Sequence, residues 1–358
     1  MLNNKNHYPA QKRYKNGINA AATSFKKNKP DNNTQNKTKT TDYNELFQNA
    51  LDYRRNSKIP LDSPFRLINL AGDSVADVAV DFYSDFAAIS WYSPKPLPLK
   101  DKIVDAILKL DIKVAGIYEV RRFNSSASAQ TYRHLTGIEA PEFFEVEEEG
   151  EKFLCSFSHG QNAGFFIDNR ENRKLIREIS SGKRVLNLFA YTGALSVVAA
   201  RACASDVVTV DISKSYNNWA KKNLVLNGFD KFSEKVFTFD ALDYMNFCLK
   251  KDYRFDFVIL DPPSFATRVN NKPFSTRKNY SDLLAAAAKI ININGIILAV
   301  CNTAAMAEDE FKFIINDSLK SAGVKKFKLA KGGGLPLDFR CQAGDWQANY
   351  LKSYIIEF

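Results

Sequence analysis

The 358-residue sequence contains few of the side chains that bind metals or form disulfides. Its three histidines, His7, His134 and His159, are far apart in the sequence, so no metal site is predicted. The cysteines are scattered and form no Cys-x-x-Cys pair, which argues against a disulfide framework and suits a reducing compartment. We therefore expect a cytoplasmic protein. The cysteines are Cys155, Cys203, Cys248, Cys301 and Cys341.

Long apolar runs are also missing. No stretch approaches the ~18 consecutive apolar residues of a membrane-spanning helix, and the N-terminal residues lack the apolar segment of a secretory signal. We therefore expect no membrane contact. The composition, 45% apolar and 25% charged, is that of a globular protein. A chain of this length is expected to form two domains and to bury a sizeable core.

Acidic residues are nearly absent from the first 40 residues. This segment has nine Lys or Arg against one acid, Asp31, so it carries most of the net charge of +10. It is rich in Asn, Lys and Thr and poor in apolar residues, which predicts a disordered tail over residues 1–42. A basic tail commonly binds the phosphate backbone of a nucleic acid. The alternative is a solubility tail or a targeting extension.

Residues 43–158 have the pattern of a small α+β domain, a candidate for contact with RNA or another substrate. Its short extended runs are separated by turn residues, and a Pro-rich stretch at 93–98 ends the last of the first three. We expect helices at 43–57 and 99–110, strands at 65–70, 75–82, 86–92 and 114–120, and an acidic hairpin at 143–157.

From residue 159 to residue 358, strand-like and helical segments alternate. This alternation predicts a parallel, doubly wound, Rossmann-like sheet, so the expected fold class is α/β, preceded by the small α+β domain. Two closing runs would complete seven strands. The expected strands are 185–189, 207–211, 235–240, 255–261, 295–301, 325–330 and 350–358, and the expected helices are 194–203, 214–227, 241–250 and 281–292.

The loop after the first of these strands lacks the G-x-G-x-x-G motif of dinucleotide-binding proteins. It has one turn glycine, Gly193, preceded by Phe189 and Tyr191, where a ligand can approach the backbone and a helix N-terminus. The second strand ends at Asp211, placed to accept hydrogen bonds from ribose hydroxyls. The third ends at Asp240, placed to accept one from an adenine amino group.

Each of these residues has a structural alternative, because a turn glycine or an Asp helix cap occurs in many α/β folds. Their order on successive strands is more specific. Together with an Asp-Pro-Pro-Ser-Phe motif at 261–265, it is typical of class I methyltransferases that use S-adenosylmethionine (SAM).

Residues 62–358 resemble the ribosomal RNA large subunit methyltransferases of type I and, more distantly, the type K/L guanine enzymes. The resemblance rests on the segments 63–73, 159–170, 185–193, 261–265 and 350–352. It implies an RNA methylase that uses SAM, with a β-rich domain before the catalytic one. It further implies that Phe166 lies near the substrate and that Arg170 binds the cofactor, where an Arg would suit the methionine carboxylate. An ion pair of Arg170 with Asp168 or Glu171 is the alternative.

One departure from the type I family concerns RNA binding. Members usually begin with a PUA RNA-binding domain, and the first 42 residues here are too short and too polar to form one. RNA contact would then fall to the basic tail, the small domain or both. The oligomeric state, monomer or homodimer, stays open.

Two chemical routes to a methylated base require different residues in the active site. A carbon such as cytosine C5 needs a Cys nucleophile, and Cys301 is the one Cys at a catalytic strand end, although the family's Cys aligns with Asn302 through Met306. A buried structural Cys is the alternative. A nitrogen has its own lone pair and needs only to be held. The Asp-Pro-Pro motif suits this second route, with Asp261 and the Pro262 carbonyl as acceptors and Phe265 as a stacking ring.

The loop at 267–280 is basic and has no acid. It is expected to contact RNA phosphates and perform base stacking, unless it is an ordinary solvated lid. Its candidate substrate-binding residues are Arg268, Arg277, Lys278 and Tyr280.

The sequence therefore predicts a SAM-dependent methyltransferase acting on a base of ribosomal RNA. Two alternatives remain: a methyltransferase for a small molecule or a protein on the same fold, and a catalytically weak RNA-binding or assembly factor.

Overall fold

The computed structural model of the chain describes residues 41–123, 131–160, 162–263, 265–269, 272–342 and 348–358, and it describes only the backbone of residues 265–269 and 272–278. Residues 41–358 form one compact unit. The tail predicted for residues 1–42 lies outside the described residues except for its last two. Within the described part, no helix has both the length and the apolar character needed to cross a bilayer.

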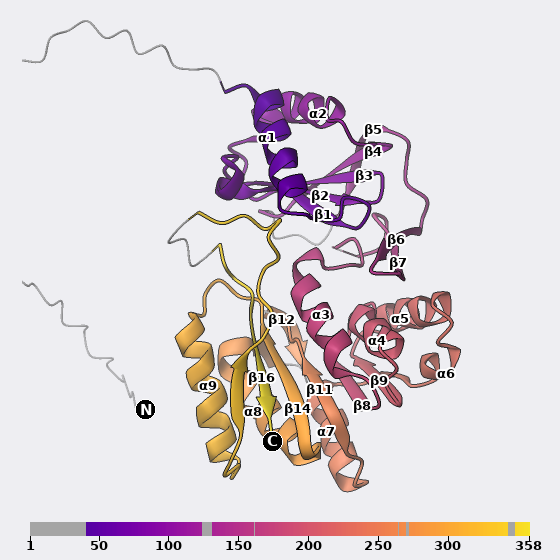
Figure 1. The fold of residues 1–358 in the computed structure, drawn as a ribbon, viewed down its shortest axis with the longest axis vertical. Helices are drawn as coiled ribbons and strands as arrows, with labels where there is room; N and C mark the ends of the chain where they lie inside the picture. The colour runs from indigo at the N-terminus through magenta and orange to yellow at the C-terminus, as the bar shows by residue number, and fades with distance from the viewer. Residues whose placement is uncertain (1–40, 124–130, 161, 264, 270–271, 343–347) are drawn as a thin grey trace, which may run out of the picture. The chain divides into compact units, whose positions relative to one another are not determined.

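The N-terminal part contains a five-stranded sheet in the order β1-β2-β3-β4-β5, covered on one face by two helices (Figure 1). Asp42 caps helix α1: its carboxylate accepts hydrogen bonds from the backbone of the first turn. Phe47 and Leu51 of α1 are fully buried against the sheet. The elements are α1 (Tyr43–Asn56), β1 (Phe65–Asn69), β2 (Val78–Tyr83), β3 (Phe86–Trp91), α2 (Lys100–Leu108), β4 (Gly116–Arg121) and β5 (Arg133–Gly137).

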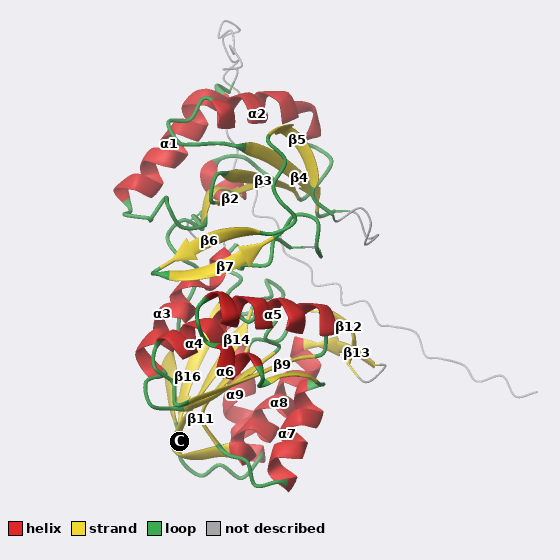
Figure 2. Cartoon of the chain, turned by 90° about the vertical axis from the view of Figure 1, so that its right-hand side faces the viewer, coloured by secondary structure: helices red, strands yellow, loops and turns green. Residues whose placement is uncertain are grey.

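A two-stranded hairpin, β6 (Phe144–Glu148) and β7 (Glu151–Cys155), follows this sheet. Its backbone is tied to a helix of the C-terminal part, because the Leu154 N–H donates to Asn223 and the Lys152 N–H donates to Asn227. The hairpin predicted at 143–157 is thus present, and it packs on the elements that follow it in the chain (Figure 2).

The C-terminal part is a seven-stranded sheet in the order β10-β9-β8-β11-β14-β16-β15. The five neighbouring strands β10, β9, β8, β11 and β14 run parallel, and β16 is antiparallel to both of its neighbours. The chain order reverses between β8 and β11, which is the position where α/β sheets bind ligands. The strands are β8 (Arg184–Leu188), β9 (Asp206–Asp211), β10 (Val236–Thr238), β11 (Phe255–Leu260), β14 (Ile291–Cys301), β15 (Lys328–Lys331) and β16 (Lys352–Glu357).

Helices cover both faces of this sheet, which confirms the predicted α/β class. Consecutive strand residues point to opposite faces, so Val185 packs with α3, α4 and α5 whereas Leu186 packs with α7, α8 and α9. The helices are α3 (Arg170–Ile179), α4 (Ala194–Arg201), α5 (Lys214–Leu226), the short α6 (Asp230–Ser233), α7 (Ala241–Lys250), α8 (Thr276–Ile290) and α9 (Glu308–Ser321); a small β-ribbon, β12 (Phe265–Val269) and β13 (Lys272–Ser275), precedes α8.

Candidate active site

A cavity of about 470 Å³ lies where the parallel strands end. Loops after β8, β9, β10, β11 and β14 form one side of it, and the segment before α3 together with the start of β16 forms the other. Residues far apart in the sequence therefore meet at one edge of the sheet, as the doubly wound fold requires. The strand-end residues on its wall include Phe189, Tyr191, Asp211, Asp240, Asp261 and Asn302; the other side includes Asn162, Phe166, Asp168, Asn169 and Tyr350.

The loop after β8 is held in a fixed turn. Phe189, Tyr191 and Gly193 all have positive φ, at 57°, 52° and 77°, a backbone conformation that residues other than glycine rarely adopt. A Cβ on Gly193 would lie 2.7 Å from the Cβ of Ala220 in α5. Gly193 therefore shapes the loop from behind the cavity wall, while Tyr191 lines the cavity itself.

Asp211 connects this loop to β9. One carboxylate oxygen accepts from the Tyr191 N–H at 2.9 Å, and the other accepts from the Ser213 N–H at 2.8 Å. Burial raises the pKa of Asp211, and the two backbone hydrogen bonds oppose the shift. The carboxylate is therefore fixed in orientation at the cavity wall, with lone pairs left to accept from a ligand.

Asp240 caps a helix, and its predicted role in binding the adenine amino group stays a prediction. Its Oδ1 caps α7 by accepting from the N–H groups of Leu242 and Asp243, at 2.9 and 3.1 Å. The same residue also lines the cavity. Because the cap uses one carboxylate oxygen, the other can accept a hydrogen bond from a bound ligand.

Asp261 has a strongly perturbed carboxyl group at the cavity wall. Its Oδ2 accepts from Asn169 Nδ2 at 2.7 Å, whereas its buried Oδ1 has no hydrogen-bond partner among the described residues. Burial raises the pKa of Asp261 to about 7, with Asn169 opposing the shift and the nearby Asp168 adding to it. A buried acceptor without a partner is costly, so this atom is suited to a donor that arrives with a ligand.

Aromatic rings form part of the wall beside these carboxylates. The Phe166 ring, 42% exposed, lies 5.0 Å from the Tyr191 ring, which in turn lies 4.5 Å from Tyr216. The predicted role of Phe166 in substrate binding stays a prediction, but its position at the cavity agrees with it. Three further residues line the cavity but were not predicted from the sequence: Asn169, Tyr216 and Tyr350. Asn169 and Tyr350 stand in the segments that resemble the family, and this resemblance is the signal that could have identified them.

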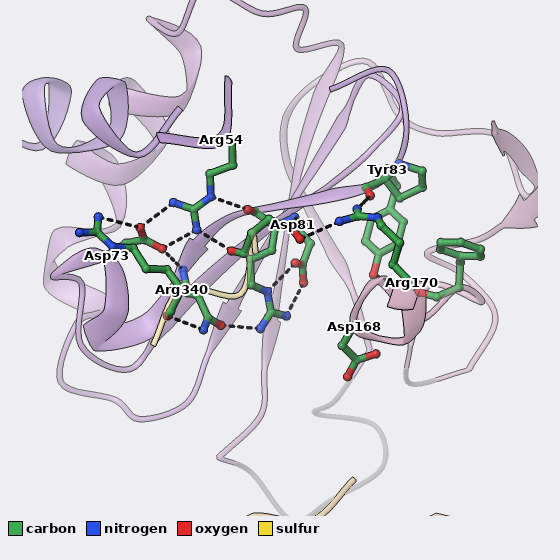
Figure 3. A network of polar contacts seen from close by, with 12 residues as sticks. Arg54, Asp73, Asp81, Tyr83, Asp168, Arg170 and Arg340 are labelled. Atoms are coloured by element: carbon green, nitrogen blue, oxygen red, sulfur yellow. Dashed lines mark hydrogen bonds and ion pairs between the residues drawn. The ribbon is translucent and has the colours of Figure 1, made fainter. Parts of the chain in front are cut away.

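The prediction that Arg170 binds the cofactor is wrong, and so is its alternative. The guanidinium is buried and donates to Glu148 at 3.2 Å, to Asp338 at 2.7 Å and to the Pro64 carbonyl at 2.6 Å (Figure 3). All three of these partners are structural, and the residue does not line the cavity. Arg170 instead ties α3 to the hairpin and to two distant loops.

Two further predictions are corrected. Tyr280, proposed to bind substrate, is fully buried in the core, and its hydroxyl donates to the carbonyls of Leu260 and Val300 at 3.2 and 2.9 Å. Cys301, a candidate nucleophile, is also fully buried, with its sulfur 3.7 Å from the sulfur of Met306. Burial raises the pKa of the Cys301 thiol, which disfavours the reactive thiolate. The next residue, Asn302, lines the cavity in its place.

The remaining predicted residues belong to the Asp-Pro-Pro motif and to the basic loop. Side chains of Phe265, Arg268, Arg277 and Lys278 lie outside the described part of the chain. Pro262 is buried, and the neighbouring Pro263 is the proline that lines the cavity. Among the described residues, no group of three or more His, Cys, Asp or Glu is placed to hold a metal ion.

The cavity fits SAM by the chemistry of its walls. Asp211 and Asp240 offer fixed acceptors on adjacent strands for hydroxyl and amino groups, the aromatic wall offers apolar surface, and the orphaned Asp261 Oδ1 offers a further acceptor. The strand order and this edge of the sheet define the protein as a class I SAM-dependent methyltransferase.

Comparison with known proteins agrees. Residues 120–330 match the family described as S-adenosylmethionine-dependent methyltransferase, so the chain belongs to this family and SAM is its cofactor. The crystal structure of SMU.776, provisionally described as a methyltransferase and complexed with SAH, superposes with a TM-score of 0.81 at 33% identity, over 88% of this chain and 81% of that one.

Two sequence relatives carry more specific names. A Bacillus subtilis protein provisionally named ribosomal RNA large subunit methyltransferase YwbD is 32% identical over 82% of this chain and 74% of its own length. Ribosomal RNA large subunit methyltransferase I of Aeromonas salmonicida is 29% identical over 81% of this chain and 74% of its own. The resemblance seen in the sequence is thereby confirmed.

Proposed function

We propose that this protein methylates a base of ribosomal RNA at an atom that has its own lone pair, a ring nitrogen or an amino nitrogen. The names of the relatives support RNA as the substrate. The choice of acceptor atom rests on one observation: a partly neutral carboxyl group, Asp261, presents an unpaired acceptor beside the cofactor cavity.

The walls of the cavity suit an acceptor nitrogen. SAM, when bound, supplies an electrophilic methyl group on a sulfonium sulfur. The residues then need to hold the nitrogen in line and exclude water. Asp261 Oδ1 would accept a hydrogen bond from an acceptor N–H and take its proton, because its pKa of about 7 lies near neutral pH. Asn169 holds the other oxygen at 2.7 Å and so orients the carboxyl group.

The same walls do not suit attack from carbon. Cytosine C5 becomes nucleophilic only after a Cys adds to the ring. The Cys301 thiol is enclosed in the core with a raised pKa, and no Cys is among the residues that line the cavity in the described part of the chain. Asn302 has no nucleophilic group to replace it.

Contact with the RNA backbone would come from the basic tail and from the basic loop at 267–280. Both carry several Lys or Arg with few acids, so both would bind phosphates without reading the sequence. The small α+β domain is proposed as a further contact with RNA.

Nucleoside mass spectrometry of ribosomal RNA tests the proposal. RNA from cells without the gene should lack one methylated nucleoside, and the purified protein with SAM should restore it to that RNA. The methyl group should be on nitrogen. A 5-methylcytosine product, or unchanged ribosomal RNA in cells without the gene, would refute it.

RNA containing 5-fluorocytidine gives an independent test of the acceptor. Enzymes that use a Cys nucleophile become trapped on this base, because the C5 fluorine cannot leave as a proton does. We expect no covalent complex on a denaturing gel, and a Cys301→Ser variant should be as active as wild type. A trapped complex that disappears in this variant would show attack from carbon.

A further inference from the structure

A second cavity, of about 270 Å³, adjoins the cofactor cavity. One side of it comes from strands β1, β2 and β3 of the N-terminal sheet, and the other from the segment at 162–168 with Phe339 and Tyr350. Four residues line both cavities: Asn162, Phe166, Asp168 and Tyr350. A molecule in the second cavity would therefore lie directly beside one in the first.

The wall from the N-terminal sheet is polar and rigid. Arg66 makes a bidentate ion pair with Asp81, at 2.7 and 2.9 Å, and donates to Asn69 at 2.9 Å. Its guanidinium also lies over the Phe339 ring, 4.2 Å from the centroid. Figure 3 shows Asp81 with its ion pair. Since these groups satisfy one another, they form a preorganised surface that does not have to rearrange for a ligand.

Aromatic rings flank the cavity. Tyr92 at the end of β3 is 42% exposed although it is large and partly apolar. Tyr132 is half-buried; burial raises the pKa of its hydroxyl to about 12, and the centroid of its ring lies 5.6 Å from the guanidinium carbon of Arg122. Rings and guanidinium planes together are the surfaces on which proteins stack nucleobases.

A carboxylate stands at the boundary of the two cavities. Asp168 Oδ2 accepts from the Tyr350 hydroxyl at 2.6 Å, which fixes the group in place. Burial raises the pKa of Asp168, and the hydrogen bond from Tyr350 opposes the shift. In its ionised form the carboxylate only accepts hydrogen bonds, so it would select the edge of a base that carries N–H donors.

We propose that the second cavity receives the acceptor nucleotide of the RNA, with Tyr92 stacking on it, Asp168 accepting from one N–H of its edge, and the reacting nitrogen directed through the shared side toward Asp261, which is near Asp168. This inference rests on the proposed function. The volume of the second cavity, about 270 Å³, is just below the roughly 300 Å³ at which pockets for drug-sized ligands begin, and it suits one extruded nucleotide. Base extrusion brings a base to an atom that a paired strand would hide.

The test separates nucleotide binding from cofactor binding in the full-length protein. Tyr92→Ala should raise the KM for ribosomal RNA by roughly tenfold through lost stacking, while the Kd for SAH measured by calorimetry stays unchanged. Tyr92→Phe keeps the ring and should restore the KM. Tyr253→Ala removes an equally exposed tyrosine, 44% exposed and outside both cavities, and serves as the matched control with no change expected.

Equilibrium dialysis of nucleoside 5′-monophosphates against the SAH-saturated protein adds a measurement that needs no turnover. At least one of the four should bind to wild type and lose affinity in Tyr92→Ala. Unchanged KM and unchanged nucleotide affinity in this variant would overturn the cavity assignment, as would an equal loss of SAH binding. Nucleotide binding that depends on Tyr92, combined with no methylation of any RNA, would instead overturn the proposed function alone.

Discussion

The two carboxylate oxygens of Asp261 have different surroundings. One oxygen is held by Asn169, and the other is buried without a partner among the described residues. Burial is the main cause of its raised pKa. The protein accepts an unfavourable environment at this position, which is typical of a group placed for chemistry.

We predict that Asp261→Asn lowers kcat by about 100-fold or more, because proton transfer to a positioned group contributes on that order. In wild type, kcat should rise with pH through about 7, as the carboxyl group loses its proton and becomes able to accept another. Steady-state rates between pH 5.5 and 8.5 check both. A flat profile, or an Asn variant with wild-type rates, would contradict a role in proton transfer.

As pH rises, the same carboxyl group should lower the stability of the fold, whereas it raises kcat. Its folded pKa, about 7, lies above the ordinary value of 3.8, so the folded state binds more protons between these values. The contribution of Asp261 to the free energy of unfolding must then fall as pH rises from about 4 to about 7. Relative to wild type, Asp261→Asn should therefore gain melting temperature as pH rises across this window. Parallel melting curves at pH 5 and pH 8 would rule this out.

Asp211 should matter for cofactor binding more than for the reaction step. We predict that Asp211→Ala reduces the affinity for SAM at least tenfold, since charge-assisted hydrogen bonds of a carboxylate contribute about 1.5–3 kcal/mol. Calorimetry measures the effect, with Asp252→Ala as a control whose side chain is 83% exposed. Unchanged SAM affinity would refute the ribose assignment.

The sequence predicted residues at strand ends far better than residues held by distant partners. Asp211, Asp240 and Asp261 follow strands that the apolar pattern marks, and all three line the cavity. The prediction for Arg170 failed because its partners Glu148 and Asp338 lie 22 and 168 positions away in the sequence, and no local pattern can indicate such partners.

At the scale of elements, the turn before α4 depends on one glycine. Gly193 has φ of 77° and no room for a Cβ against α5. We predict that Gly193→Ala lowers both the melting temperature and the SAM affinity, because the loop must shift away from α5. Gly228→Ala also has positive φ but meets no atom within 4 Å, so it isolates the effect of the contact. Equal losses in the two variants would attribute the effect to backbone strain alone.

Element prediction succeeded for most elements that bury an apolar face, although α9, which buries Phe311, Ile315 and Leu319, was not predicted. The parallel strands and α4, α5 and α7 follow the predicted ranges closely, because each buries an apolar stripe. Helix α3 was missed: its buried face consists of Arg170, Asn172, Arg173 and Ile176. Its side chains are satisfied by ion pairs such as Arg173 with Glu148 at 2.6 Å, and hydrophobic periodicity does not detect such a face.

At the scale of the whole molecule, Asp338 joins segments from three parts of the chain. Its carboxylate accepts from Arg170 at 2.7 Å and from the Arg66 N–H at 2.9 Å, and its carbonyl accepts from Arg54 at 2.7 Å. Asp338 is fully buried. These bonds connect the N-terminal sheet to α3 and thereby fix the walls of both cavities.

We predict that Asp338→Ala lowers the free energy of unfolding by about 3–5 kcal/mol, the usual cost of leaving one member of a buried ion pair unpaired. Denaturant unfolding measures it, and the exposed Asp317→Ala is the control. A loss as small as that of the control would mean that Glu148 and the Pro64 carbonyl suffice for Arg170.

The first 40 residues carry most of the net positive charge of the protein. If those residues bind phosphates, deleting them should weaken RNA binding and flatten its dependence on salt, because each neutralised phosphate adds about 0.7–0.9 to the slope of log K against log salt. Filter binding at several salt concentrations measures the slope for the full and the shortened chain. The Kd for SAM is the internal control and should not move, since the cavity is built from residues beyond 160. An identical slope in the two proteins would assign RNA attraction to the basic loop at 267–280 and the small domain.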